Sequence, residues 1–356
     1  MSKTIYFIVP YPYQEAPSQR FRFEQYFHYL KSEGFEIEIH SFLDQKTWKQ
    51  LYGEGNTAGK IKGILKSFVR RFRLLFSLKK ADYIFIHREA SHLGPPVFEW
   101  IISRVLRRKY IYDFDDAIWL PNYSEANAKF HRLKAYWKVR YCMKWAHQIT
   151  AGNNYLAAYA RQFNSNVTVI PTTIDTVNHH NLTTDYEAEK ITIGWTGTHT
   201  TMHYLDDLIP VLKELELEYT FDFVVISNQK PDYDLKSLLF VPWNKETEIQ
   251  DLARLNIGVM PLKQDIWSEG KCGFKGLQYM SLGIPTLMSP VGVNTEIVEN
   301  GINGFLVQTP AEWKSALELL LQNAQLRREI GKAGKEKTEK VYSVNSNKLK
   351  YKALFQ

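Results

Sequence analysis

Cysteine is scarce in this sequence of 356 residues. Cys142 and Cys272 are the only two, which is too few for a disulfide framework or for a zinc site built on four thiolates. So few cysteines are typical of a protein from a reducing compartment, and that is the setting we expect.

Long apolar runs are also missing. No stretch approaches the roughly 18 consecutive apolar residues that a membrane-spanning helix requires. The first apolar run, Ile5–Val9, ends at Pro10 and is shorter than the core of a signal peptide. We therefore expect a cytoplasmic protein, in which the glycosylation sequons at Asn122, Asn166 and Asn181 have no role.

Acidic residues are unevenly distributed, and the first half has few of them. Residues 1–180 carry 26 Lys and Arg against 15 Asp and Glu, a balance of +11, whereas residues 181–356 carry 19 against 23, a balance of −4. The total is +7. A chain of this length fits two domains of about 150 residues each, and halves of opposite charge are expected to meet different partners.

Strand-like runs alternate with helix-period segments along most of the chain. In the first half they are Thr4–Val9, Glu36–Phe42, Tyr83–Ile86, Tyr110–Phe114, Gln148–Ala151 and Val167–Ile170, and a helical pattern covers Phe21–Lys31. In the second half they are Ile191–Trp195, Phe221–Ile226, Ile257–Leu262, Thr286–Ser289 and Phe305–Val307. This alternation is typical of parallel, doubly wound α/β sheets.

A polar stretch between the two halves, Asp175–Lys190, has neither period and is interpreted as a linker. We expect one Rossmann-like domain at 1–175, a second at 176–340, and a C-terminal helix at 341–356 that packs back on the first domain. In such pairs a ligand normally occupies the crevice at the carboxyl ends of the strands, between the domains.

A glycine-containing segment follows the first strand of the second half and precedes apolar residues at helical spacing. Glycines at a strand-to-helix turn let backbone N–H groups approach an anion, and the helix N-terminus adds partial positive charge. The alternative is a plain tight turn capped by Thr200 or Thr201. The candidate phosphate contacts are Gly194, Thr196, Gly197 and Thr198.

A second segment, Glu269–Pro285, begins as a Gly-rich charged turn and continues as a helix. Lys271 and Lys275 are four residues apart, so if both are helical they present two ammonium groups on one face near a helix start. That arrangement suits a diphosphate, and the alternative is a solvated basic turn.

Several of these segments together resemble one enzyme family. Residues 257–307 look like the donor-binding half of the family 4 retaining glycosyltransferases, of the bacterial group 1 type, which have the two-domain GT-B fold. Val169–Asp175 resembles the end of the first domain in that family, and Val9–Pro12 with Ala16–Arg22 is similar to the N-terminal strand and loop of a bacterial branch. The resemblance implies two Rossmann-like domains that face each other across a cleft, the first for the acceptor and the second for a nucleotide sugar.

The resemblance also implies roles for residues of the second domain. The family usually has two glutamates eight positions apart, one for the hydroxyls of the donor sugar and one for the ribose. Here the second position is Gln278, which can still hydrogen-bond a hydroxyl. The first position is Gly270, a departure from the pattern, and Glu269 beside it is our candidate for the sugar contact.

The implied activity is that of a hexosyltransferase of class EC 2.4. It would move a sugar from a UDP- or GDP-sugar to a glycan or lipid-linked acceptor with retention of anomeric configuration, in the biosynthesis of cell-surface polysaccharide. We expect no cofactor and no metal ion, because Lys271 and Lys275 would stabilise the departing diphosphate. A degenerate transferase that binds a nucleotide without catalysis is an alternative, motivated by Gly270 and Gln278.

The acidic motif Asp113–Asp116 follows a strand of the first half. Read as Asp-x-Asp, it predicts the metal and nucleotide site of GT-A transferases, because paired carboxylates chelate divalent cations. We prefer a cleft position in which Asp115 or Asp116 orients an acceptor hydroxyl or accepts its proton. A helix N-cap with a structural carboxylate is the third interpretation.

Four further residues are candidates for the acceptor site. His87 and Arg88 close another strand of the first half, and Arg20 and Arg22 lie beyond the first strand, where they could meet a phosphate. Surface positions without function are the alternative for all four.

Residues 60–80 hold eight basic residues and no acidic one. Apolar residues form one helical stripe and basic residues another, and the apolar stripe is expected to be partly core. The apolar set is Ile61, Ile64, Leu65, Phe68, Phe72 and Leu75, and the basic set is Lys62, Lys66, Arg70 and Arg73. Residues 126–150 form a second acid-free run, rich in aromatics.

Basic amphipathic helices of this kind predict peripheral contact with an anionic membrane surface, on its inner face. Ordinary domain helices are one alternative. A second is a protein that binds RNA or single-stranded DNA through interleaved basic and aromatic residues, although we expect no nucleic-acid partner.

Overall fold

The computed structural model describes residues 2–52, 55, 57–121 and 131–356. The chain forms two compact units. Unit 1 runs to Thr172 and includes Lys348–Gln356, and unit 2 is Thr173–Asn347. The sequon at Asn122 and positions 126–130 of the second acid-free run lie outside the described residues.

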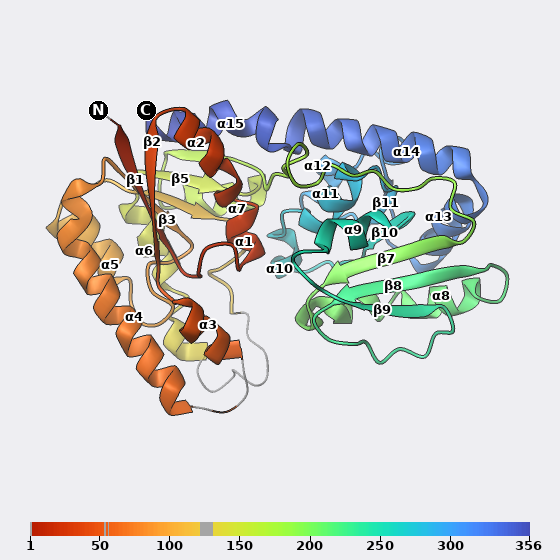
Figure 1. Cartoon of the computed structure of the whole chain (residues 1–356), viewed down its shortest axis with the longest axis horizontal. Helices are drawn as coiled ribbons and strands as arrows, with labels where there is room; N and C mark the ends of the chain where they lie inside the picture. The colour runs from red at the N-terminus through yellow and green to blue at the C-terminus, as the bar shows by residue number, and fades with distance from the viewer. Residues whose placement is uncertain (1, 53–54, 56, 122–130) are drawn as a thin grey trace. The chain divides into compact units, whose positions relative to one another are not determined.

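Unit 1 is built on a six-stranded parallel sheet in the order β2-β1-β3-β4-β5-β6. The strands are β1 Lys3–Val9, β2 Phe35–Ser41, β3 Tyr83–His87, β4 Ile111–Phe114, β5 Gln148–Ala151 and β6 Val167–Val169. The central strands are buried along nearly their whole length, as expected of a parallel sheet covered on both faces. Figure 1 shows helices on both sides of it.

The helices of unit 1 fill the crossovers between these strands. They are α1 Pro17–Arg20, α2 Phe27–Ser32, α3 Gln45–Tyr52, α4 Thr57–Ser77, α5 Val97–Trp100, α6 Lys138–Trp145 and α7 Asn154–Arg161, with α15 Val344–Lys352 ending in this unit. Short 3-10 or π-helical turns are η1 Glu24–Tyr26, η2 Leu78–Lys80, η3 Ile101–Val105, η5 His131–Lys134 and η8 Ala353–Phe355. Aromatic side chains dominate the core, where Phe7 packs against Phe23, Phe27 and Phe85.

Unit 2 repeats the plan with a parallel sheet in the order β12-β11-β10-β7-β8-β9. Its strands are β7 Ile191–Gly197, β8 Phe221–Ser227, β9 Leu238–Pro242, β10 Ile257–Met260, β11 Thr286–Met288 and β12 Phe305–Leu306. Its helices are α8 Ile209–Leu215, α9 Glu248–Ala253, α10 Ile266–Glu269, α11 Phe274–Ser281, α12 Asn294–Ile297, α13 Pro310–Gln322 and α14 Ala324–Lys337, with η6 His199–Leu205 and η7 Thr338–Tyr342.

The predicted fold class is confirmed: two six-stranded parallel sheets, each wound with helices. Every strand expected from the sequence is present, and β9 is an additional strand. It lies at the edge of its sheet, two of its five residues are exposed and none is buried, and it ends in Pro242, so it lacks the buried β-rich pattern of the others.

Two local expectations are corrected. The single helix expected over Phe21–Lys31 is broken into η1 and α2, because the chain turns at Arg22 and Phe23 to bury both side chains. The stretch expected to be a linker, 175–190, packs on unit 2, where the Thr184 N–H donates to the Leu282 carbonyl and the Tyr186 hydroxyl to the Gly283 carbonyl.

Within the described residues, no helix combines the length and the apolar character needed to cross a bilayer.

Candidate functional site

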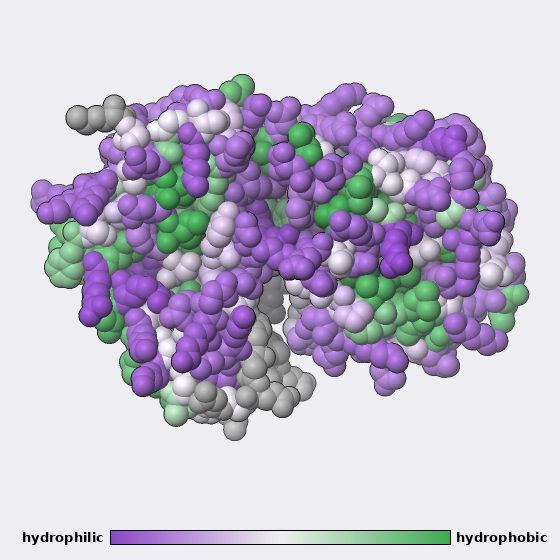
Figure 2. All heavy atoms as spheres, viewed as in Figure 1, coloured by the Kyte–Doolittle hydropathy of each residue, from purple (hydrophilic) through white to green (hydrophobic). Residues whose placement is uncertain are grey.

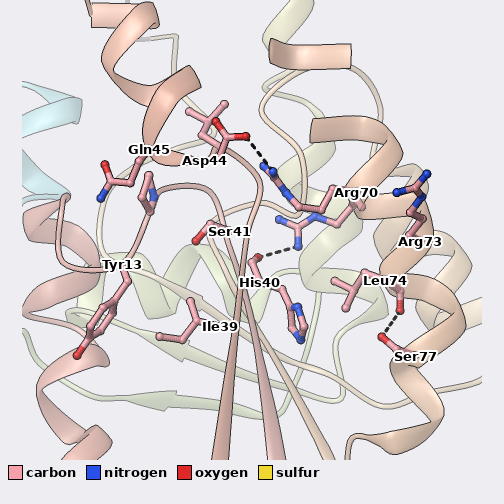
Figure 3. A pocket seen from close by; sticks show the side chains of 13 residues that line it. Tyr13, Ile39, His40, Ser41, Asp44, Gln45, Arg70, Arg73, Leu74 and Ser77 are labelled. Carbon is pink, nitrogen blue, oxygen red and sulfur yellow. Dashed lines mark hydrogen bonds and ion pairs between the residues drawn. The ribbon is translucent and has the colours of Figure 1, made fainter. Parts of the chain in front are cut away.

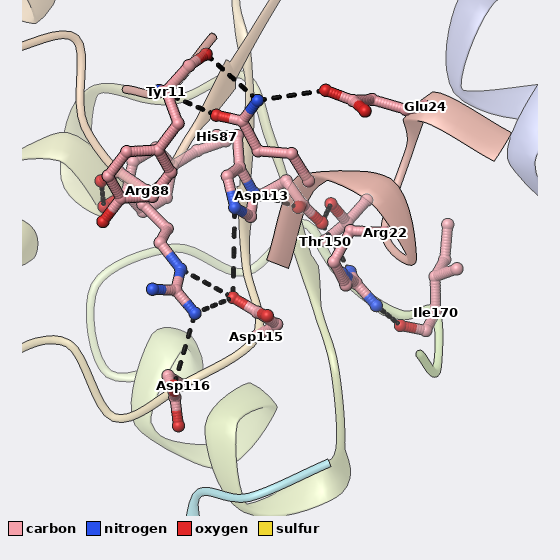
Figure 4. A network of polar contacts seen from close by, with 12 residues as sticks. Tyr11, Arg22, Glu24, His87, Arg88, Asp113, Asp115, Asp116, Thr150 and Ile170 are labelled. Atoms are coloured by element: carbon pink, nitrogen blue, oxygen red, sulfur yellow. Dashed lines mark hydrogen bonds and ion pairs between the residues drawn. The ribbon is translucent and has the colours of Figure 1, made fainter. Parts of the chain in front are cut away.

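Three polar side chains of unit 1 lie side by side on neighbouring parallel strands. His87 ends β3, Asp113 lies opposite it on β4, and Thr150 lies opposite Asp113 on β5. All three are buried. The carboxyl end of a parallel sheet is where α/β proteins place their ligands, so this row marks the candidate site of unit 1 (Figure 4).

Asp113 is the centre of the network. One carboxylate oxygen accepts from Thr150 Oγ1 at 2.6 Å and from the Arg22 guanidinium at 2.5 Å, and the other contacts His87 Nδ1 at 2.7 Å. Burial alone would raise the pKa of Asp113, but the Arg22 charge and the His87 hydrogen bond outweigh it and hold the pKa well below its usual range. Asp113 is therefore a buried, ionised anchor.

The guanidinium of Arg22 is buried within this network. It is 1% exposed and also donates to the carbonyl of Ile170. The structure thus gives Arg22 an internal partner in place of the phosphate suggested by the sequence. Arg20 is 9% exposed and lies over the Phe21 ring, with 4.9 Å between guanidinium carbon and ring centroid.

His87 presents its second ring nitrogen to the acidic motif. Since Nδ1 faces the ionised Asp113, it acts as the donor, which orients the ring. Nε2 is buried and has no hydrogen-bond partner among the described residues, and it lies 4.0 Å from Asp115 Oδ1. A buried imidazole nitrogen without a partner can receive a polar group of a ligand.

Arg88 bridges the two remaining carboxylates of the motif, Asp115 and Asp116. Its Nε donates to Asp115 Oδ1 at 2.7 Å and its Nη2 to Asp116 Oδ2 at 3.3 Å. Burial would lower the pKa of Arg88, but the two carboxylates outweigh it and raise that pKa above its ordinary value. Arg88 has φ +57°, a left-handed conformation that is costly for a side chain of this kind and typical of functional loops.

The Asp-x-Asp motif is therefore split. Asp113 faces His87 and Arg22, whereas Asp115 and Asp116 face Arg88. Residues 117–120 form turns and not a helix, so the motif is not an N-cap. Among the residues that the structure describes, no cluster of three or more His, Cys, Asp or Glu side chains is arranged to hold a metal ion.

A second polar group beside Arg88 was missed by the sequence reasoning. Lys138 Nζ contacts Glu89 Oε2 at 2.8 Å, and His92 Nδ1 lies 3.4 Å from Glu89 Oε1. Burial lowers the pKa of His92 to about 4 although Glu89 opposes this, so the ring is neutral at pH 7. A cleft beside these residues is lined by Tyr11, Arg88, Glu89, Ile118, Lys134, Tyr136, Lys138 and Val139.

A larger cavity of about 640 Å³ opens beside the ends of β1 and β2 (Figure 3). One wall is α4, whose Arg71 is buried and donates to the carbonyls of Ala90, His40 and Val9 at 2.7–3.0 Å. Burial lowers the pKa of Arg71 to about 9. Arg70 contacts Asp44 at 3.1 Å. These contacts fix α4 to the sheet.

In unit 2 the predicted turn begins later than expected, because Gly194 lies inside β7 and Gly197 is the last residue of that strand. β7 continues through Gly197, and the turn comes at Thr198, which precedes η6. A Cβ on Gly194 would be 2.2 Å from Leu255 Cδ2, and one on Gly197 would be 2.5 Å from the Trp195 ring. These glycines make room for packing, which explains them without a ligand.

The neighbouring threonines have internal contacts. The Thr196 N–H donates to the Tyr279 hydroxyl at 2.8 Å, which links β7 to α11. Thr198 has an extended backbone, and its hydroxyl lies 2.8 Å from that of Thr200. Of the predicted phosphate contacts, only Thr198 therefore lies at the turn.

The two lysines of the predicted diphosphate site do not share a helical face. Lys271 lies in the irregular residues 270–273, and only Lys275 belongs to α11. Lys271 Nζ is 4.9 Å from the Trp267 ring centroid, and Lys275 Nζ is 5.0 Å from that of Trp195. In the chain the two lysines still flank Phe274, the first residue of α11, where the backbone adds partial positive charge.

The turn before α11 depends on glycine. Gly273 caps the helix with φ +66°, and a Cβ there would be 2.2 Å from Ile297 Cδ1. Gly292, at φ +55°, lies so close to the backbone of Glu269 that a Cβ would be 2.8 Å from its carbonyl oxygen. Glu269 itself ends α10 and accepts a hydrogen bond from Gln264.

Gln278 is buried and belongs to a cluster of three polar side chains that the sequence did not indicate. Its Nε2 lies 3.4 Å from Glu248 Oε1 and 3.3 Å from His180 Nε2. All three residues are at most 6% exposed. Glu248 begins α9, and His180 comes from the stretch expected to be a linker. No spacing in the sequence connects them.

Unit 2 contains a segment that is similar to a known protein family. Residues 190–323 match the family model of the group 1 glycosyl transferases. No relative among curated proteins matches the sequence.

Solved structures with the same fold cover the whole chain. Sucrose-phosphate synthase from Thermosynechococcus elongatus has a TM-score of 0.73 at 13% identity, over 99% of this chain and 98% of that one. A glycosyltransferase from Rickettsia africae has a TM-score of 0.67 at 14% identity, over 99% and 98%. HepE of Anabaena, in complex with UDP and glucose, has a TM-score of 0.65 at 15% identity, over 99% of each chain. The chain thus has the two-unit fold called GT-B, and the match of residues 190–323 supports a glycosyltransferase family.

Proposed function

We propose that the protein is a glycosyltransferase that moves a sugar from a nucleotide diphosphate sugar, such as a UDP- or GDP-sugar, to a glycan or lipid-linked acceptor. The observation that carries the proposal is the family match over residues 190–323, which spans unit 2 from β7 to the end of α13. Unit 2 would take the donor and unit 1 the acceptor. The UDP in the HepE structure favours UDP among the nucleotides.

The start of α11 is the proposed position of the donor diphosphate. Lys271 precedes this helix and Lys275 lies in its first turn, where the aligned backbone dipoles add partial positive charge. Fixed positive charge of this kind stabilises a leaving diphosphate. Gln278, one turn further along, would contact a ribose hydroxyl, and Glu269 the sugar.

The proposed reaction breaks the bond between the anomeric carbon and the diphosphate oxygen and forms a bond from the acceptor oxygen to that carbon, with retention. The acceptor hydroxyl loses its proton in the process, and an oxygen of the departing diphosphate takes up that proton. Asp115 already accepts from Arg88, so it is better suited to orient this hydroxyl than to remove its proton. Asp116 shares Arg88 and would support it, and His87 Nε2 would hydrogen-bond a substrate hydroxyl.

We further propose that the transfer proceeds without a metal ion, at the inner face of a membrane, in the biosynthesis of cell-surface polysaccharide. The two lysines supply the positive charge that a metal would otherwise bring to the diphosphate. Activity should therefore be unchanged by EDTA. Loss of activity in EDTA, with recovery on adding Mg²⁺ or Mn²⁺, would contradict this part of the proposal.

A panel of nucleotide sugars tests the activity. The melting temperature of the protein should rise with one nucleotide class, and the matching nucleotide sugar should be slowly hydrolysed in the absence of acceptor. Lys271→Ala and Lys275→Ala should each weaken nucleotide diphosphate binding about tenfold or more. The matched control is Lys230→Ala with Lys332→Ala, two exposed positions of the same unit.

The outcomes are distinct. No response to any nucleotide would refute the proposed function. A response that survives both lysine substitutions would leave the activity standing and move the diphosphate away from the start of α11.

A further inference from the structure

Helix α4 of unit 1 is attached to its sheet through an unexpected face. The residues turned inward are Gly63, Ser67, Arg71 and Leu74. A Cβ on Gly63 would be 2.6 Å from Thr47, so glycine is what lets α3 approach, and Arg71 is fixed by three backbone carbonyls. The predicted apolar stripe lies beside this inward face and is partly buried, as expected: Ile64, Phe68 and Leu75 are half-buried, whereas Ile61, Leu65 and Phe72 are exposed.

The consequence is a row of apolar side chains directed away from the sheet. This outer stripe consists of Ile61, Leu65, Val69, Phe72 and Phe76, at spacings of three and four residues that place them on one face of the helix. Their exposed fractions run from 47% for Phe72 to 83% for Phe76. Figure 2 shows hydrophobic residues among hydrophilic ones along the outer edge of this unit, where α4 lies.

The apolar surface continues beyond the helix. Phe72 packs edge-on against Phe98 at 4.9 Å between centroids, and both line a hollow of about 350 Å³ with Phe68 and Leu133. Val97 belongs to this hollow and to a second one of about 240 Å³. The second hollow is lined by the aromatic side chains Trp100, Trp137, Tyr141 and Trp145. Contiguous exposed apolar surface of this kind marks an interaction site.

A basic row runs beside the outer stripe. Lys62, Lys66 and Arg73 are exposed and lie on the adjacent face of α4. No aspartate or glutamate occurs from Thr57 to Lys80. Exposed apolar residues flanked by lysine and arginine match the boundary between acyl chains and anionic headgroups, and tryptophan is enriched at that depth. A protein interface, by contrast, is usually depleted of lysine.

We propose that this face of unit 1 docks on an anionic lipid bilayer. The outer stripe enters the boundary between headgroups and acyl chains, the basic row meets the headgroups, and the two hollows accommodate acyl chains at the surface. The inference deepens the proposed function, and rests on it, in that it states where a lipid-linked acceptor is met. Binding of vesicles is nevertheless measured independently of binding of a nucleotide.

The test is flotation of the full chain with vesicles of phosphatidylcholine mixed with phosphatidylglycerol, compared with phosphatidylcholine alone. Ile61→Asn, Leu65→Asn and Phe76→Asn are combined in one variant, because these side chains are 57%, 60% and 83% exposed and their loss should not disturb the fold. Binding to the anionic vesicles should fall about tenfold or more. The matched control is Leu217→Asn, Ile302→Asn and Leu349→Asn, also 81%, 55% and 71% exposed, and it should bind as the unmodified protein does.

A charge variant separates the two contributions. Lys62→Gln with Lys66→Gln should weaken binding to the anionic vesicles about 25-fold, because each basic residue near such a surface contributes on the order of fivefold. Lys230→Gln with Lys332→Gln in unit 2 should not. The unmodified protein should bind less tightly as salt is raised.

Three results would overturn the proposal. The first is that the unmodified protein does not bind anionic vesicles, and the second is that the Asn variant of the outer stripe binds them equally well. The third is that this variant only converts a dimer into a monomer, because the surface would then join two copies of the chain. If the protein binds vesicles but responds to no nucleotide, the proposed function is refuted and the docking surface is retained. If it responds to a nucleotide but does not bind vesicles, the docking surface is refuted and the proposed function is retained.

Discussion

His87 and Asp113 lie opposite each other on β3 and β4, and the 2.7 Å contact between Nδ1 and Oδ2 orients the imidazole so that Nε2 faces Asp115. The pair is completely buried, and Arg22 and Thr150 complete the surroundings of the carboxylate. An anchored ring with one nitrogen left for a ligand is the central feature of unit 1.

Asp113→Asn should destabilise unit 1 strongly. The substitution leaves the guanidinium of Arg22 buried without its counter-charge, which costs about 3–5 kcal/mol in comparable buried pairs. Thr150→Val is the matched control, because it removes one uncharged hydrogen-bond donor from the same carboxylate, and the loss of a hydrogen bond to a charged group should cost about 1.5–3 kcal/mol. Unfolding in urea, followed by fluorescence, measures both. Equal and small effects would mean that the Arg22 pair contributes little.

Because of the Asp113 carboxylate, the free energy of unfolding should decrease as the pH falls in the acid range. Because the folded pKa of Asp113 is lowered, its contribution is fully present above the unfolded pKa of about 4 and is lost as pH falls through the folded pKa. The difference in unfolding free energy between the unmodified protein and Asp113→Asn should therefore be constant from pH 7 to pH 5 and shrink below about pH 4. A constant difference down to pH 3 would contradict the depressed pKa.

His87→Asn should separate orientation from catalysis. The Asn amide can still donate to Asp113 from the position of Nδ1, but Nε2 is gone. We expect sugar transfer to fall about 100-fold while the free energy of unfolding changes by about 1 kcal/mol. His87→Gln, which keeps a polar group near Nε2 and loses the Nδ1 contact, should recover part of the activity. Transfer unaffected by His87→Asn would remove His87 from the site.

Gln278→Glu would place a carboxylate where the glycosyltransferases that this chain resembles usually have one, and we expect the change to be harmful here. The new carboxylate would lie beside Glu248, whose Oε1 is 3.4 Å from the present amide nitrogen. Two buried carboxylates this close raise the pKa of one of them. The destabilisation, on the order of 1–3 kcal/mol at pH 8, should be fully present above that raised pKa and should fade toward pH 5.

Combining Gln278→Glu with Glu248→Gln tests this explanation, because the exchange restores one amide and one carboxylate. The double variant should be more stable than Gln278→Glu alone at pH 8. If Gln278→Glu is as stable as the unmodified protein, His180 and not Glu248 determines the charge that this position accepts.

The sequence predicted well where the strands end, but it did not indicate which side chains contact the residues at those ends. Short β-rich runs placed His87, Arg88 and the Asp113–Asp116 motif at the carboxyl edge of one sheet, because strand period and parallel topology are local properties. The contact from Arg22 to Asp113 spans 91 positions, and no local pattern encodes it. The left-handed backbone of Arg88, and with it the split of the acidic motif, is likewise set by tertiary contacts.

Local rules failed in particular where a small residue serves packing. Glycine is usually a signal for a turn, yet Gly194 lies in β7 because Leu255 occupies the space of a side chain, and Gly63 lies in α4 because Thr47 does. In α4 the inward face is formed by Gly63, Ser67, Arg71 and Leu74, which the apolar pattern alone did not indicate. The predicted apolar stripe is partly buried, as expected.

Gly194→Ala tests the packing explanation of the predicted phosphate turn. A Cβ at this position would be 2.2 Å from Leu255 Cδ2, so β7 or Leu255 must shift, and we expect a loss of about 1–3 kcal/mol in unfolding free energy. Leu255→Ala alone should cost about 2–5 kcal/mol through the cavity it leaves. If the two residues compete for one space, the double variant Gly194→Ala with Leu255→Ala should lose less than the sum of the single losses. Strictly additive losses would contradict this explanation, and a selective loss of nucleotide binding by Gly194→Ala, without loss of stability, would restore the phosphate-binding interpretation of this glycine.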